Sequence, residues 1–206
     1  MKKEYILGIL FFSGLWGISE AVLGGALYKS EIEHAPTILT VIGLVILTFA
    51  NVYFPQKGTA TAIASLAMLY KFLNAPFFAC HLLGILLTGF CYDLSLNILK
   101  IRNRSVSAVV TVYASYSLFA LMITYLARYE YWVQGGFGKV LNHIGVGGTI
   151  AALLCAIMVP LSYRFAERLK LSLPMPFAYR RQLLPGSVLF ATAGLWVFGL
   201  AVSLFS

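Results

Sequence analysis

The chain contains seven long apolar stretches, and these constrain its fold more than any other feature. A transmembrane helix needs roughly 20 consecutive, mostly apolar residues. With 60% hydrophobic and only 11% charged residues, the composition excludes an ordinary soluble domain. We therefore expect an all-α, polytopic integral membrane helix bundle that forms one transmembrane domain over residues 1–206. The predicted spans are 6–28, 37–54, 59–73, 78–99, 105–127, 144–163 and 184–205; the third is the weakest, because it is short and contains Lys71.

The basic residues segregate to one side of this predicted bundle. When the connections are assigned alternately to two sides, Lys29, Lys71, Arg128 and Lys139 fall on one side and the other eleven of the 15 Lys and Arg residues fall on the opposite side. Such an excess is typical of cytoplasmic loops. We therefore expect a multi-pass protein of the cell membrane, inner or plasma, with a cytoplasmic N-terminus and an external C-terminus. Because topology accounts for the basic clusters, nucleic acid is not expected as a partner.

Sequence motifs for common enzyme chemistry are absent. The segment Gly135-Gly136-Phe137-Gly138-Lys139 lacks the spacing of a P-loop, and neither HExxH nor GxSxG occurs. The three cysteines form no CxxC pair, which argues against a disulfide framework or a zinc site. We expect no catalytic residues and no intrinsic cofactor.

Small residues recur every four positions in the first predicted span, at Ser13, Gly17, Ala21 and Gly25. Such a ridge lets another helix approach closely, which is a principal source of helix association in lipid. Two interpretations remain open: packing within this chain, or docking on a separate membrane subunit.

A group of polar residues lies at the outer level of the predicted spans. Ionisable side chains cost roughly 2.5 to 3.5 kcal/mol at the centre of a membrane helix, so each needs a reason. Glu20 lies about 14 residues, or ~21 Å, along the first span, in the outer half of the bilayer. The other residues placed at this level are Lys71, Asn74, Cys80, His81, His34 and His143.

Two interpretations of this outer group remain open. In the first, Glu20 pairs with Lys71 and the histidines cap helices or face water. In the second, Glu20, Lys71 and Asn74 bind the polar groups of a ligand in a pocket walled by aromatic side chains. In this second interpretation, Cys80 or His81 is the axial ligand of a metal in a tetrapyrrole ring. We expect one of the two as ligand, because neighbouring residues of one helix do not easily chelate one ion.

Two further segments have alternative roles. Residues 130–138, which are rich in aromatic residues and glycine, predict either a flexible lid or an interfacial aromatic belt. Near the inner end of the fourth span, Asp93 and Asn97 lie one helical turn apart, as in an internal hydrogen-bond network or a pairing with an inner Lys or Arg. For this inner pair we favour a structural role.

From the second span to the sixth, the order of features resembles the S-components of energy-coupling-factor transporters, small membrane proteins that bind vitamins or metal-containing cofactors. The similar features are a basic-Gly turn and small-residue helix at 57–62, a Leu- and Gly-containing helix at 82–89, Trp132 and Gln134 in an outer loop, and a small-residue helix at 145–149. The ridge at Ser13, Gly17 and Ala21 is similar to the Ala-x-x-x-Ala docking motif of the family.

This resemblance covers residues 6–170 and implies a six-helix core, to which 184–205 adds a seventh helix. It implies a substrate pocket closed by outer loops, docking on a transmembrane coupling subunit with its ATPases, and Cys80 in the region where some cobalamin-binding members place a cobalt ligand. We therefore expect a substrate-binding subunit for uptake of a corrinoid or related metal tetrapyrrole, with a smaller vitamin as second choice.

Two alternatives to this function remain open. The chain could be a structural or anchoring subunit of a larger membrane complex, such as a redox enzyme, in which the ridge and the seventh span are buried against other chains. Alternatively, Glu20, Lys71 and His81 could serve as acid and base groups of an intramembrane enzyme.

Overall fold

The computed structural model describes residues 2–30, 34–74, 79–172 and 185–205, which are almost entirely helical and include no strand. Its α-helices are α1 (Lys2–Lys29), α2 (Ala35–Tyr53), α3 (Thr59–Asn74), α4 (Ala79–Asp93), α5 (Arg104–Leu121), α6 (Glu130–Asn142), α7 (Gly148–Ser172) and α8 (Pro185–Phe205). Three π-helical turns, η1 (Leu94–Ile98), η2 (Met122–Leu126) and η3 (His143–Gly147), extend α4 and α5 and join α6 to α7.

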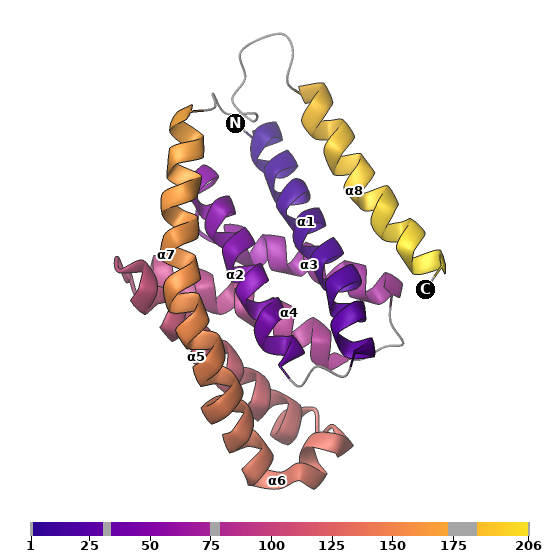
Figure 1. The fold of residues 1–206 in the computed structure, drawn as a ribbon, viewed down its shortest axis with the longest axis vertical. Coiled ribbons are helices and arrows are strands. Elements are labelled where there is room, and N and C mark those ends of the chain that lie inside the picture. Colours follow the sequence, from indigo (N-terminus) through magenta and orange to yellow (C-terminus); the bar gives the residue numbers. More distant parts are fainter. Residues whose placement is uncertain (1, 31–33, 75–78, 173–184, 206) are drawn as a thin grey trace.

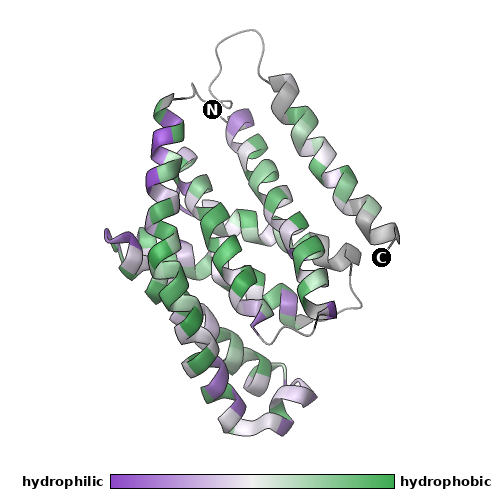
Figure 2. Ribbon diagram, in the orientation of Figure 1, coloured by the Kyte–Doolittle hydropathy of each residue, from purple (hydrophilic) through white to green (hydrophobic). Residues whose placement is uncertain are grey.

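The described helices form a membrane-type bundle. Five of them are long and apolar enough to cross a bilayer, and shorter apolar helices cover Thr59–Leu69 in α3 and Leu189–Gly199 in α8. Hydrophilic residues concentrate at helix ends, most clearly at the start of α1 and the end of α7 (Figure 2). The helical membrane class is therefore confirmed, whereas the number of spans stays a prediction.

The bundle is layered, with α1, α2 and α7 in front of α3, α4 and α5, and with α8 alongside α1 (Figure 1). Its core lies between these layers, around fully buried side chains such as Trp16, Leu44, Ile63, Tyr92 and Val112. Helices α1 and α8 lie side by side and run in the same direction (Figure 1).

The prediction of a loop at 130–138 is wrong, because this segment folds as part of helix α6. An amide-carboxylate hydrogen bond one turn apart supports the helix, from Gln134 Nε2 to Glu130 Oε1 at 3.0 Å. Gly136, at φ 58° and ψ −162°, interrupts it with a kink. The helical segment Glu130–Leu171, which includes this kink and the π-helical turn η3, has 42 residues, about twice the roughly 20 residues that a transmembrane helix needs. The kink lets α6 turn at the end of the bundle (Figure 1).

Asp93 joins α4 to the first turn of α3. Its Oδ2 accepts hydrogen bonds from the backbone N–H and the hydroxyl of Thr61, both at 2.7 Å, and its Oδ1 accepts one from Asn97 Nδ2 at 3.1 Å. The carboxylate thus satisfies backbone and side-chain donors near the end of the bundle. The predicted internal network of Asp93 and Asn97 is confirmed.

The ridge on α1 is only partly used within the chain. Ser13 and Gly17 are buried, Ala21 is half-buried and Gly25 is exposed. Helix α8 packs along α1, and Trp196 Nε1 donates a hydrogen bond to the carbonyl of Leu10 at 3.3 Å. Packing inside the chain therefore accounts for Ser13 and Gly17, and docking on a partner stays a prediction.

Candidate functional site

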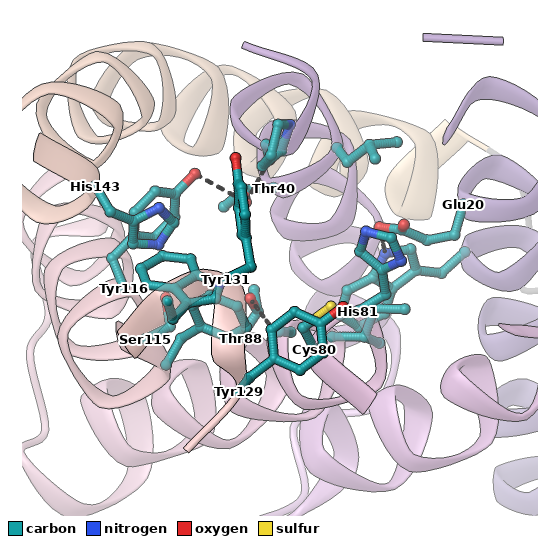
Figure 3. Close-up of a pocket in the computed structure, with 17 residues that line it drawn as sticks. Glu20, Thr40, Cys80, His81, Thr88, Ser115, Tyr116, Tyr129, Tyr131 and His143 are labelled. Carbon is teal, nitrogen blue, oxygen red and sulfur yellow. Dashed lines mark hydrogen bonds between the residues drawn. The ribbon is translucent and has the colours of Figure 1, made fainter. Parts of the chain in front are cut away.

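A cavity of about 470 Å³ lies at one end of the bundle. It is formed by the second half of α1, the start of α2, the start of α4, the end of α5 and the segment that leads from α5 into η3 (Figure 3). Because successive helices alternate in direction, these portions all meet at the same end. The lining residues are Trp16, Glu20, Pro36, Leu39, Thr40, Cys80, His81, Gly84, Ile85, Thr88, Ser115, Tyr116, Phe119, Tyr129, Tyr131, Trp132 and His143.

Glu20 supplies a carboxylate in the cavity wall. It is 7% exposed, and its Oε1 accepts a hydrogen bond from Trp16 Nε1, one turn earlier on α1, at 3.2 Å. The Trp16 ring packs closely against α2, where a Cβ at Gly43 would come within 2.8 Å of it. Only glycine permits this approach, so α2 helps to fix the indole that holds the Glu20 carboxylate.

Cys80 and His81 occupy the first turn of α4, and both side chains are half-buried. In Figure 3, Glu20 and His81 are at one side of the cavity, and His143 and Tyr116 are at the other. Cys80 is a free thiol. Within the described ranges no group of three or more His, Cys, Asp or Glu side chains is arranged to hold a metal ion; the prediction that one of Cys80 and His81 is an axial ligand requires only a single donor and stays a prediction.

Aromatic rings form the opposite wall. The His143 imidazole stacks on Tyr116, with ring centroids 4.7 Å apart and planes at 15°. Trp132 meets His143 edge-on at 5.1 Å, and Phe119 meets both rings at 5.3 Å. Such pairs stabilise a wall beyond simple area burial. The π-helical turn η3 begins at His143 and brings α6 and α7 together at this wall.

The kinked helix α6 contributes the part of the wall nearest the end of the bundle. Lys139 connects the two parts of this helix on either side of the kink. Its ammonium donates a hydrogen bond to the Tyr131 carbonyl at 3.1 Å and lies 2.8 Å from the centroid of the Tyr131 ring. Trp132, at 8% exposure, is buried under α6, whereas the Tyr131 side chain is 66% exposed. Helix α6 therefore gives the cavity both a buried and an accessible aromatic surface.

Three hydroxyl groups of the cavity donate their hydrogens within the protein. Thr40, Thr88 and Ser115 donate to the backbone carbonyls of Pro36, Gly84 and Val112 at 2.8, 2.8 and 3.0 Å. The hydroxyl groups of Thr40 and Tyr116 also share a hydrogen bond of 3.3 Å, which joins α2 to α5 at the cavity.

The structure brings together five of the eight ligand-binding residues predicted from the sequence: Glu20, Cys80, His81, Trp132 and His143. His34 is instead exposed at the N-cap of α2, makes no side-chain capping bond and does not line the cavity. The side chains of Lys71 and Asn74, at the end of α3, lie outside the described part.

Lining residues that were not predicted individually from the sequence include Trp16, Thr40, Tyr116 and Phe119. The depth along the spans that selected Glu20 and Cys80 applies equally to them, but aromatic and hydroxyl residues are also common in helix packing. Only Trp16 carried a sharper signal, because it lies four residues before Glu20 and therefore on the same helix face.

Comparisons with known protein families, with curated protein sequences and with solved structures returned no match for this chain. The fold and site define a multi-pass helical membrane protein with an aromatic, carboxylate-containing cavity at one end of the bundle.

Proposed function

We propose that this protein is the substrate-binding membrane subunit of an uptake system, of the S-component type, and that the cavity binds a vitamin-sized organic molecule. The observation that carries the proposal is the convergence of Glu20, Cys80, His81, Trp132 and His143 on one cavity. These residues come from four separate segments of the sequence. If each of these residues had only a structural role, they would not need to lie around the same cavity.

The size and lining of the cavity favour a compact ligand. Pockets of about 300–1,000 Å³ hold drug-sized molecules, and this cavity has about 470 Å³. A corrinoid, with its tetrapyrrole ring and nucleotide tail, is larger than such ligands and would leave much of its surface outside. We therefore place the smaller vitamin ahead of the metal tetrapyrrole. Stacked rings around His143 suit a flat ring system, and Glu20 suits a polar group at the other side.

The charge distribution supports an external position for the cavity. The described basic residues near the opposite end of the bundle include Lys57, Lys100, Arg102, Arg164 and Arg168. By the positive-inside rule, that end is cytoplasmic and the cavity opens outside. The proposed topology has seven spans, with the N-terminus inside and the C-terminus outside; the common direction of α1 and α8 supports an odd number of spans (Figure 1).

In this proposal, partner proteins supply the energy for uptake. These partners are a transmembrane coupling subunit and its ATPases. The sequence has no P-loop of its own. The end of the ridge, where Ala21 is half-buried and Gly25 is exposed, supports a contact with another helix. Because α8 lies along α1, such a partner would approach beside α8.

The decisive experiment is purification of the protein followed by mass spectrometry and a visible absorption spectrum of any bound small molecule. We expect a colourless, ring-containing compound of vitamin size; an intense visible band would instead indicate a corrinoid or haem. Glu20→Gln and Cys80→Ala should weaken its retention, whereas Cys91→Ala, in the core, should not. Unchanged retention in both site variants would remove the site assignment. Stable partner subunits without any small molecule would favour the anchoring alternative.

A further inference from the structure

A second cavity, of about 560 Å³, lies at the other end of the bundle. It is formed by the end of α2, by η1 and the connection that follows it, by the start of α5 and by Tyr163 in the second half of α7. These are the ends opposite to those that form the first cavity. The lining residues are Asn51, Pro55, Leu96, Asn97, Lys100, Ile101, Arg102, Arg104 and Tyr163.

Three cations line this cavity, and no Asp or Glu belongs to the lining. Lys100 and Arg102 come from the connection after η1, and Arg104 is the first residue of α5. Across the described ranges, none of the three has a carboxylate oxygen within 4.0 Å. Two carboxylates lie behind the lining and contact it through hydrogen bonds from neutral groups: Asp93 accepts from Thr61 and Asn97, and Glu167 accepts from the Tyr163 hydroxyl at 2.6 Å.

The backbone holds these cations in a defined arrangement. Lys100 has φ 51°, a left-handed conformation that is costly for a residue with a side chain. Hydrogen bonds on both sides of it fix the turn, from Leu99 N to the Leu94 carbonyl at 2.9 Å and from Ile101 N to the Ser95 carbonyl at 3.1 Å. The same turn ends η2 at Arg128, with φ 48°, so this conformation belongs to the ending of the π-helical turn and fixes the backbone from which the Lys100 side chain projects.

Arg104 is also held in place before any ligand arrives. Its guanidinium lies 4.2 Å from the centroid of the Tyr163 ring, so α7 provides a platform for it. Asn103 caps α5 by accepting from the N–H groups of Ser105 and Val106 at 3.0 and 3.2 Å. Those N–H groups are thus used within the protein, and the cavity depends on side-chain cations rather than on the helix terminus.

We propose that this cavity binds a phosphate group, either in the headgroup of an anionic lipid or in a soluble phosphate compound. Guanidinium groups match phosphate oxygens with paired hydrogen bonds, and a lysine adds a point charge. The amide of Asn51 adds a neutral donor at the wall. Basic pockets between transmembrane helices at the cytoplasmic face suit lipid phosphates. The inference does not depend on the ligand of the first cavity.

The test compares two variants with the same change in charge at the same end of the bundle. Lys100→Gln with Arg102→Gln removes two cations from the cavity, and both side chains are exposed, so folding should tolerate the change. Arg164→Gln with Arg168→Gln removes two exposed cations of α7 that do not line it. Thermal unfolding checks that each variant is folded, and Arg102→Gln alone replaces the first pair if it is not.

Two arms distinguish the source of the phosphate. In the first, native mass spectrometry measures retention of phosphatidylglycerol against phosphatidylcholine. In the second, calorimetry measures binding of inorganic pyrophosphate to protein in phosphatidylcholine nanodiscs. We expect the cavity variant to lose roughly tenfold or more in apparent affinity in at least one arm, and the α7 variant to retain it. Equal losses in both variants, or no binding in either arm, would overturn the proposal. Retention of any compound in the first cavity is measured on the same samples and reports on the uptake function separately.

Discussion

At the scale of single residues, the position of the Glu20 carboxylate depends on a chain of close contacts. Trp16 donates to it at 3.2 Å, and Trp16 is in turn 1% exposed and fixed by its approach to Gly43. A buried carboxylate on a membrane helix is costly unless it is hydrogen-bonded. The indole therefore reduces the cost of keeping Glu20 at the cavity.

Replacing Glu20 by Gln tests its charge with little change in shape. The Gln side-chain oxygen still accepts from Trp16, so the geometry of α1 should persist. A hydrogen bond to a charged group contributes about 1.5–3 kcal/mol, so we expect the co-purified ligand to bind roughly tenfold or more weakly, as measured by its retention in native mass spectrometry. Glu4→Gln makes the same charge change at the other end of α1 and should leave retention unchanged. A similar loss in both variants would contradict a specific role of Glu20.

Cys80 should be the thiol that reacts first. Its side chain is half-buried in the cavity wall, whereas Cys91 and Cys155 are 1% and 0% exposed in the core. In detergent, we expect one rapid alkylation by N-ethylmaleimide, absent from Cys80→Ala and slowed by a bound ligand. Peptide mass spectrometry locates the modified residue. Rapid modification of Cys91 or Cys155 would show that the core opens more readily than this packing implies.

At the scale of helices, Asp93 is the main polar link between α3 and α4. Asp93→Ala removes the acceptor of three hydrogen bonds, including one from the backbone N–H of Thr61. We expect a loss of about 2–4 kcal/mol in the free energy of unfolding, measured by denaturation in mixed micelles. Asn97→Ala removes one of these bonds and should cost about 1 kcal/mol. Equal effects of the two substitutions would rule out this ranking.

Gly136 determines the course of α6. At φ 58° and ψ −162° it occupies a conformation that is essentially restricted to glycine. Gly136→Ala should therefore cost about 1–3 kcal/mol and move Tyr131 and Trp132 at the cavity, which weakens ligand retention. Gly138→Ala is the matched control, because a Cβ there meets nothing within 4 Å and the backbone is not at positive φ. It should be neutral or slightly stabilising. Thermal unfolding and ligand retention compare the two variants.

The apolar runs predicted the long helices because burial in lipid selects for length and composition, which are visible in the sequence. They did not predict α6, because its glycines and charged residues resemble a connection and its helix depends on a kink that composition does not encode. The site was partly predictable, since depth along a span places Cys80 and His143 at one level. Depth does not give the direction around a helix axis, so it could not separate His143, which faces the cavity, from His34, which does not.

At the scale of the whole molecule, the proposed orientation places Cys80 at the external face. In intact cells, a membrane-impermeant maleimide added outside should modify Cys80, and Cys80→Ala should prevent this. A cysteine introduced at Lys57 of a Cys80→Ala chain, in the exposed turn before α3, should react only after the membrane is opened. The reverse pattern would show that the cavity opens at the cytoplasmic face of the membrane, and it would contradict uptake from outside.

The hydroxyl groups of Thr40, Thr88 and Ser115 have a chemical consequence for selectivity. All three donate to backbone carbonyls, so this region presents oxygen lone pairs to the cavity. A molecule that reaches it gains most by carrying its own N–H or O–H groups, such as ring amino substituents. A compound of the same shape that bears carbonyl oxygens at those positions would meet like partial charges, and the protein would discriminate against it.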